Sequence, residues 1–114
     1  MSNKDKSKAD VLQGTLDLMV LQTLDTMGAL HGYAIAARLE QISSGALQLN
    51  MGTLYPALMR LEQRGLVKGA WGTTDSNRRA RFYAITGAGR RQLARERQAW
   101  DQMAGIIQAL LHGR

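Results

Sequence analysis

The stretch that decides the fold is LNMGTLYPALMRLEQRGLVKGAW, residues 49–71. Its leucines Leu54, Leu58 and Leu61 recur at spacings of four and three, so a helix would carry them on one face and bury that face against other helices. The following LVKGAW, residues 66–71, is typical of a β-strand. The stretch therefore predicts a helix that leads directly into a strand.

The start of this helix is predicted from Pro56. Proline deep inside a helix costs about 3 kcal/mol, so we expect the helix to begin close before it, with Thr53 or alternatively Asn50 as the capping residue. Gly65 should end the helix, because glycine is common just past a helix C-terminus. Tyr55 would then lie at the exposed N-terminal end, where free backbone N–H groups and the helix dipole attract phosphate.

Helical spacing of apolar residues also predicts helices before and after this stretch. The first helix has apolar residues on two faces, so one face is left for a second surface such as another subunit. A polar, glycine-led connection, residues 72–78, should form the tip of a flexible hairpin flap. The further predicted elements are helices over residues 11–27, 33–42 and 86–112, the last capped by Thr86, a very short strand over 47–50, and a return strand over 79–85.

Length and composition limit the class of protein. The chain has 114 residues, enough for one domain, and residues 1–10 read as a flexible polar tail without the apolar core of a signal peptide. No apolar run approaches the roughly 18 residues of a membrane span. There is no cysteine, so no disulfide framework is expected. We predict a cytoplasmic protein.

The positive charge is concentrated in one part of the chain. The net charge is +6, and residues 60–97 contain ten basic residues against three acidic ones. A basic block within folded sequence favours a face that meets a polyanion. On charge alone, a solvated arginine-rich surface is an equally good interpretation.

The last helix carries a short heptad stripe that no later element covers. Leu93, Trp100 and Ile107 are spaced by sevens, with Met103 and Leu110 between them. We therefore expect the chain to pair with a copy of itself, helped by the two-faced first helix. The predicted dimer interface consists of Leu16, Val20, Leu93, Trp100, Met103, Ile107 and Leu110.

Three helices, a two-stranded flap and a long final helix are the order of a winged helix-turn-helix fold, mainly α with a small β-hairpin. Residues 11–85 would form the DNA-binding domain and residues 86–114 the dimerisation helix. The third helix would enter a major groove about 12 Å wide, and flap arginines would reach a minor groove or phosphates. Base reading is expected from the first turn onward, and phosphate contact from the Tyr55 hydroxyl. The predicted DNA-binding residues are Asn50, Thr53, Tyr55, Met59, Arg60, Arg64, Arg78, Arg79 and Arg81.

Three quoted segments together resemble the PadR family of bacterial transcriptional regulators in its short form: LHGYAI, GTLYPALMRLEQRGLV and RRARFYAITGAGRRQL. The resemblance runs from about Leu12 to Ala109 and implies a winged-helix homodimer on a palindromic operator, usually a repressor relieved by a small molecule. It also implies that an aromatic residue in the last helix lines an effector cavity. Trp100 stands at that place, with Met103 beside it, so a hydrophobic or aromatic effector is expected. Asp75 departs from the pattern, and we expect its acidic flap tip to stay off the DNA.

Other functions are less well supported by the residues. His31 and His112 lack acidic or cysteine neighbours at ligand spacing, and no serine or threonine has a paired histidine and aspartate, so we predict no metal, no cofactor and no enzyme activity. A dimeric protein-interaction module with a basic face and no specific operator is the alternative. A final helix lying on an anionic membrane is also conceivable, but it would use the stripe needed for pairing.

Overall fold

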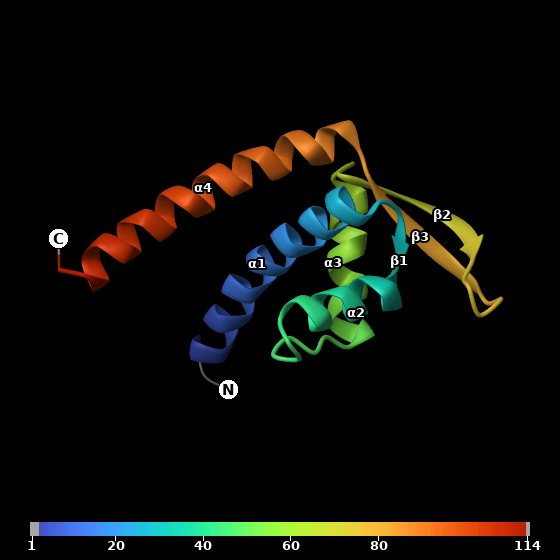
Figure 1. The fold of residues 1–114 in the computed structure, drawn as a ribbon, viewed down its shortest axis with the longest axis horizontal. Coiled ribbons are helices and arrows are strands. Elements are labelled where there is room, and N and C mark those ends of the chain that lie inside the picture. The colour runs from blue at the N-terminus through green and yellow to red at the C-terminus, as the bar shows by residue number, and fades with distance from the viewer. Residues whose placement is uncertain (1–2, 114) are drawn as a thin grey trace.

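The computed structural model describes residues 3–113 and the side chains of residues 14–113 (Figure 1). Four helices and a three-stranded antiparallel sheet follow one another in the described part of the chain. The elements are α1 (Asn3–Met27), β1 (Leu30–His31), α2 (Gly32–Ile42), α3 (Met51–Gln63), β2 (Val67–Thr73), β3 (Arg79–Ile85) and α4 (Gly87–Leu111). The expected mainly helical winged architecture is confirmed.

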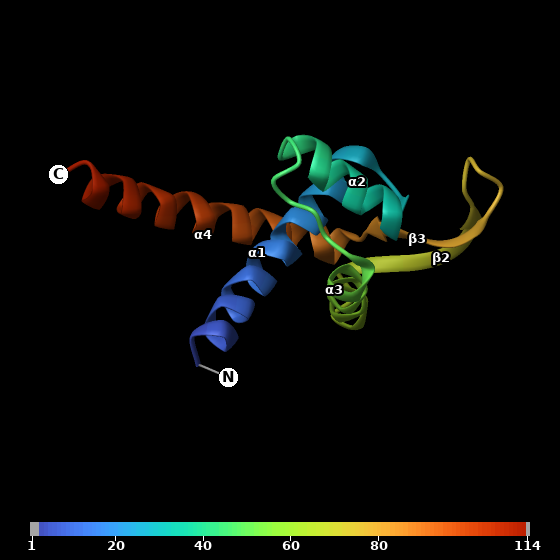
Figure 2. The same ribbon diagram turned by 90° about the horizontal axis from the view of Figure 1, so that it is seen from below.

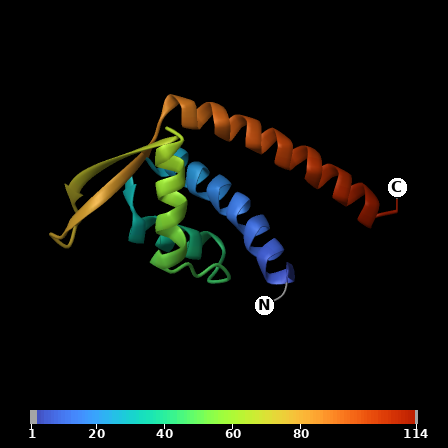
Figure 3. The same ribbon diagram turned by 180° about the vertical axis from the view of Figure 1, so that it is seen from behind.

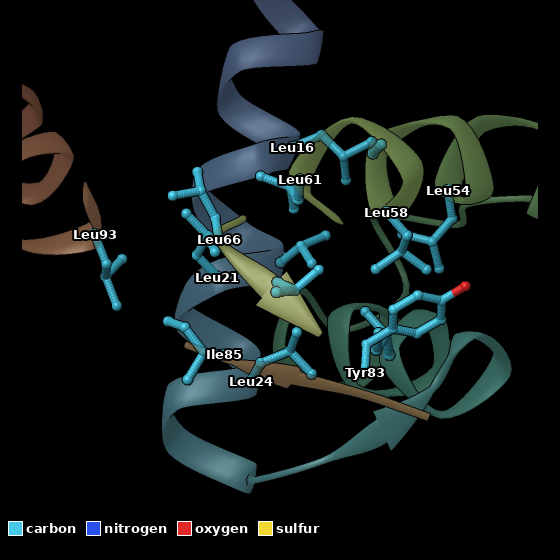
Figure 4. Packing of buried hydrophobic residues seen from close by; sticks show 14 of the residues in the cluster. Leu16, Leu21, Leu24, Leu54, Leu58, Leu61, Leu66, Tyr83, Ile85 and Leu93 are labelled. Atoms are coloured by element: carbon cyan, nitrogen blue, oxygen red, sulfur yellow. The ribbon is translucent and has the colours of Figure 1, made fainter. Parts of the chain in front are cut away.

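The core lies where α1, α2 and α3 meet the sheet (Figure 4). Leu54, Leu58 and Leu61 are all fully buried, as their spacing predicts. They pack with apolar residues of α1, α2, both long strands and the start of α4. Burial of such side chains contributes roughly 1.5–3 kcal/mol each, so this cluster fixes α3 in its orientation on the body.

Helix α3 begins earlier than Pro56 predicted, with Asn50 as its cap. Asn50, the alternative cap, accepts a hydrogen bond from the backbone N–H of Thr53 at 2.9 Å, and Thr53 is a helical residue rather than the cap. Pro56 is the sixth helical residue, further inside than predicted, and has no N–H to donate to the Gly52 carbonyl. Gly65 follows the C-cap with φ of 73°, which confirms its expected role.

The two long strands form the predicted wing. β2 pairs with β3 from Val67↔Ile85 to Thr73↔Arg79, and their tip projects away from the helices in Figures 1 and 2. β1 adds a third, very short strand on the other side of β3 through Leu30↔Tyr83 and His31↔Phe82. Sequence reasoning missed β1 because two residues between glycines carry too short a pattern to identify.

The last helix is shared between the core and an exposed extension. Thr86 caps α4 by accepting from the Gly89 N–H at 3.0 Å, and Leu93 packs into the core at 3% exposure. Beyond it, the distal part of α4 extends away from the other helices, as Figures 1, 2 and 3 all show. The longest dimension of the molecule, 54 Å, reflects this helix and the wing projecting at opposite ends.

Three expectations differ from the structure. Residues 47–50 form a loop rather than a strand, because no described strand lies beside them to pair with. Residues 1–2 of the predicted tail lie outside the described residues, whereas residues 3–10 belong to α1, since nothing there stops the helix. Leu16, Val20 and Leu93, predicted at the dimer interface, are 6%, 0% and 3% exposed in the single chain, so the core already uses them.

Candidate nucleic-acid interface

The outward face of α3 is an uncharged stripe. Gly52, Pro56, Met59 and Gln63 recur at spacings of four and three, and all of them are exposed. They lie opposite the buried leucines, and Met59 is 57% exposed. Thr53 is also exposed in the first turn. The surface that α3 offers to a partner therefore consists of methyl, thioether and amide groups, without a free cation at its centre.

Arg60, predicted to read bases, is instead turned to α1. Its Nη2 lies 3.2 Å from Oδ1 of Asp17, and its Nε is buried without a hydrogen-bond partner among the described residues. Burial raises the pKa of the Asp17 carboxyl, although the Arg60 guanidinium opposes this shift. The spacing of leucines in α3 could not reveal the pair, because Asp17 lies 43 residues earlier. Arg60 thus connects α3 to α1 and is withdrawn from the outward stripe.

The other flank of α3 is joined to the wing. Arg81 Nη2 lies 2.6 Å from Oε2 of Glu62, and this carboxylate raises the pKa of the arginine. Tyr83, two residues further along β3, is 4% exposed, and its burial raises the pKa of its phenol. Arg81 was predicted as a wing contact to DNA; the structure places it between the wing and α3, where it holds the two together.

A concavity of about 850 Å³ opens between the wing, the start of α2 and the head of α3. Tyr55 lies at its α3 side, 39% exposed, with its ring against Gly32, where a Cβ would be 3.3 Å from the ring. Arg78 and Arg79 are exposed on the wing side. The structure thus brings together the predicted Tyr55, Arg78, Arg79 and Arg81 and adds His31, Tyr33 and Trp71, which sequence reasoning did not assign to the site.

The tip of the wing is a tight turn closed by local hydrogen bonds. The Thr74 Oγ1 accepts from the Arg78 N–H at 3.1 Å, and Asn77 adopts φ of 62°. Asp75 is exposed within this turn. Arg64, the last predicted cation of α3, is exposed at the C-cap, at the opposite end of the helix from Tyr55.

A second hollow lies on the side of α1 away from the wing. A groove of about 420 Å³ separates α1, α2 and the middle of α4, and Trp100 lines it with Met19, Ile42 and Arg97. Met103 lines a separate shallow depression between α1 and α4 on another side of Trp100. The two residues predicted near an effector are therefore both beside cavities, but only Trp100 borders the deeper groove.

The distal part of α4 exposes an apolar surface. Six large apolar side chains in its last twelve helical residues are between 47% and 76% exposed, an unusual share for a surface in contact with water alone. They are Trp100, Met103, Ile106, Ile107, Leu110 and Leu111. Of the predicted interface, Trp100, Met103, Ile107 and Leu110 are thus available to a second surface.

Among the side chains of residues 14–113, no three histidine, aspartate or glutamate residues lie together as a group that could hold a metal ion. None of the helices described in residues 3–113 combines the length and the apolarity that crossing a bilayer requires.

An exposed third helix flanked by a cationic hairpin is the arrangement of a winged-helix protein. A family model described as "Transcriptional regulator PadR-like family" matches residues 20–95. The chain belongs to this family of transcriptional regulators. Its members regulate transcription and are not enzymes, as the sequence predicts.

Two curated relatives match part of the chain. An uncharacterized 37.1 kDa protein in transposon TN4556 of Streptomyces fradiae is 41% identical over 80 residues, covering 70% of this chain and 21% of that protein. Transcriptional regulator Rv3488 of Mycobacterium tuberculosis is 37% identical over 65 residues, covering 57% of this chain and 60% of that protein. The chain thus spans about a fifth and three fifths of the length of these relatives.

Solved structures share the fold over nearly the whole chain. A PadR family transcriptional regulator from Eggerthella lenta superposes with a TM-score of 0.74 at 28% identity, covering 100% of this chain and 99% of that one. A transcriptional regulator from Clostridium thermocellum gives a TM-score of 0.77 at 27% identity, covering 87% and 92%. A PadR-like regulator from Bacillus cereus gives 0.78 at 24% identity, covering 92% and 99%, which supports the fold alone.

Proposed function

We propose that the chain is a sequence-specific DNA-binding regulator that acts as a homodimeric repressor on a palindromic operator. The observation that carries this proposal is the position of Tyr55 and the wing cations around one concavity beside an exposed helix face. A duplex lying along α3 would bring a phosphate into this concavity. A DNA-binding regulator acts in the compartment that holds the chromosome, which fits the expected cytoplasmic localisation.

Base contacts fall to the exposed face of α3. Thr53 and Met59 present methyl groups that suit the thymine methyl in the major groove, and Gln63 offers an amide. Asn50 contributes mainly by capping, because its side-chain oxygen is already engaged by the Thr53 N–H. Arg60 contributes indirectly through Asp17, since an arginine held 3.2 Å from a buried carboxylate is not free to read guanine.

Backbone contacts fall to the concavity and its edges. The Tyr55 hydroxyl can donate to a phosphate, while Arg78 and Arg79 supply charge from the wing. Arg64 adds a cation at the far end of α3. Asp75 at the tip would repel phosphate, so the wing is expected to contact DNA through Arg78 and Arg79 beside the turn rather than through Asp75.

The dimer is proposed to form through α4. Its distal residues Trp100, Met103, Ile107 and Leu110 remain exposed in the single chain, and a second copy would cover them. Residues 11–85 with the first turns of α4 would then be the DNA-binding unit of each subunit. Their α3 helices would address major-groove segments about 34 Å apart.

Relief by a small molecule is proposed at the groove beside Trp100. Its volume of about 420 Å³ and its apolar lining suit a hydrophobic or aromatic compound. The groove touches α1, α2 and α4, so an occupant would alter the position of α4 relative to the DNA-binding unit. Such a shift would change the spacing of the two α3 helices.

Titration against the protein's own upstream promoter and a scrambled duplex of equal length, over a salt series, tests the proposal. We expect tighter binding to the promoter and a steep salt slope. Tyr55→Phe should weaken binding to both duplexes alike. Lys68→Ala is the control, because it removes a cation from the face of β2 that points away from the concavity, and it should change the affinity little. Equal weak binding to both duplexes by the wild type would favour the interaction-module alternative.

The dimer is tested separately by sedimentation. Leu110→Lys places a charge on the distal stripe and should shift the protein to monomers. Met59→Lys makes the same change at an exposed apolar residue outside α4 and should leave the dimer intact. Dissociation by both variants, or by neither, would contradict the assignment of the interface to α4.

A further inference from the structure

Trp71 is an exposed tryptophan on the wing that the DNA-binding role does not yet explain. It is 60% exposed and lies in β2 directly opposite Arg81. In an antiparallel pair, opposite residues and their neighbours at two positions share one face of the sheet. The pairs Gly69↔Tyr83, Trp71↔Arg81 and Thr73↔Arg79 therefore lie on one face.

This face is turned toward α3 and the concavity. Tyr83 is buried there, and Arg81 reaches Glu62 of α3 at 2.6 Å. Gly69 leaves the space that the Arg81 guanidinium occupies, because a Cβ at this position would lie 2.5 Å from the Arg81 Nε. The absence of a side chain at Gly69 thus allows the arginine to lie flat across β2.

Two guanidinium groups lie near the indole ring of Trp71. The Arg79 Cζ is 4.9 Å from its ring centroid, and the Arg81 Cζ is 6.0 Å from it. A continuous series of contacts therefore runs from Glu62 of α3 through Arg81 and Trp71 to Arg79 on the wing. The series ends on a cation at the open side of the concavity.

Of the two arginines beside Trp71, only one is paired with an acidic residue in the described part of the chain. Arg81 is neutralised by Glu62, whereas Arg79 has no acidic partner within 4.0 Å among the described residues. Stacking on an aromatic face leaves the N–H groups at the edge of a guanidinium free, and this edge is the part that binds phosphate in a bidentate manner. Arg79 is thus held in place without using the donors that a phosphate needs.

We propose that Trp71 is a positioning residue for DNA binding, which holds the Arg79 guanidinium over the concavity so that it meets a backbone phosphate beside Tyr55. The inference rests on the proposed function, since it names how one of its phosphate contacts is prepared. Trp71 itself acts through Arg79 and carries no sequence preference. Its loss should weaken binding to every duplex to the same degree.

A double-mutant cycle on promoter and scrambled duplexes tests the proposal. Trp71→Leu should weaken both complexes about three- to tenfold, Trp71→Tyr should restore most of the loss, and Arg79→Ala should lower the salt slope by about one. In the Arg79→Ala background, Trp71→Leu should have no further effect. Unchanged melting temperatures would show that these exposed positions leave the fold intact.

Fluorescence gives an independent readout. The tryptophan emission of the wild type should change when duplex is added, and this change should be absent in Trp71→Leu, whose single remaining tryptophan is Trp100. A change of equal size in Trp71→Leu would contradict the placement of Trp71 beside the DNA. Two results would overturn the positioning role while the proposed function stands. One is a Trp71→Leu variant that binds duplex as tightly as the wild type does, and the other is a Trp71→Leu change that lowers the affinity of Arg79→Ala by the same factor as that of the wild type. If the wild type bound no duplex at all, the proposed function would fail, and this inference with it.

Discussion

Gly89 lies in the first turn of α4, against Leu66, which precedes β2, and Ile85 at the end of β3. A Cβ built at this position would lie 2.7 Å from the Ile85 Cγ1 and closer still to the Leu66 carbonyl oxygen. That carbonyl is fixed, because it accepts from the Thr86 N–H at 3.1 Å. Gly89→Ala must therefore push α4 away from the body.

The cost can be worked from these contacts. Overpacking a well-packed site costs about 1–3 kcal/mol, and weakening the hydrogen bond to Leu66 adds about 1 kcal/mol. The helix preference of alanine over glycine returns up to about 1 kcal/mol. The free energy of unfolding should thus fall by about 2 kcal/mol, and at about 4 °C for each kcal/mol the melting temperature should fall by roughly 8 °C.

Gly87→Ala is the matched control for this measurement. It makes the same change two residues earlier on the same helix, where the nearest atom to a new Cβ is the Arg91 Nη1 at 3.6 Å, an ordinary contact. Thermal unfolding followed by circular dichroism should show this variant at or slightly above the wild type. A Gly89→Ala variant as stable as Gly87→Ala would refute the close approach of α4 to Leu66.

Three further predictions concern α1 and α3. Burial raises the pKa of the Asp17 carboxyl in the folded state, so the folded protein holds this proton more tightly than the unfolded chain does. The free energy of unfolding of the wild type, relative to that of Asp17→Asn, should therefore fall as pH rises from about 4 through the raised pKa. Urea unfolding at a series of pH values measures this difference. A difference that rises over the same range would mean that attraction to Arg60 outweighs burial. Asn50→Ala should lower the free energy of unfolding by about 1 kcal/mol, because the Thr53 N–H loses its cap, whereas Asn50→Asp should retain most of it. Met59→Ala should reduce the preference for promoter over scrambled DNA. Replacing thymidine by deoxyuridine in the base pairs under α3 removes the thymine methyl, and it should lower the promoter affinity of the wild type but not that of Met59→Ala. Equal losses of affinity in both proteins would show that Met59 does not read this base.

Most of the fold follows from patterns that are local in the sequence. The leucine spacing of α3, the glycine after it and the threonine before α4 each determine structure within a few residues, and all three were predictable. The two residues of β1 were not, since their pairing with β3 depends on residues more than 50 positions away. The same limit applies to the dimer stripe: periodicity alone placed Leu93 with Trp100, but the structure buries one and exposes the other.

The residues of the candidate site were predictable in part, but their roles were not. Tyr55, Arg78 and Arg79 come together as expected. Arg60 and Arg81 do not act as free cations, because each meets an acidic residue far from it along the chain, Asp17 or Glu62. A sequence shows where cations lie on a helix or strand, whereas only the folded chain shows which of them are already neutralised.

The division of α4 between core and extension separates two kinds of evolutionary change. Substitutions in its first turns alter the packing of Leu93 and are constrained by the stability of every subunit. Large apolar side chains beyond Trp100 are 47% to 76% exposed in the single chain, so their substitution costs each copy less burial. In the proposed dimer, choice of partner could therefore diverge among duplicated copies while each copy still folds. If the proposed α4 interface forms, grafting this extension between relatives would exchange pairing preference without redesigning the body that carries it.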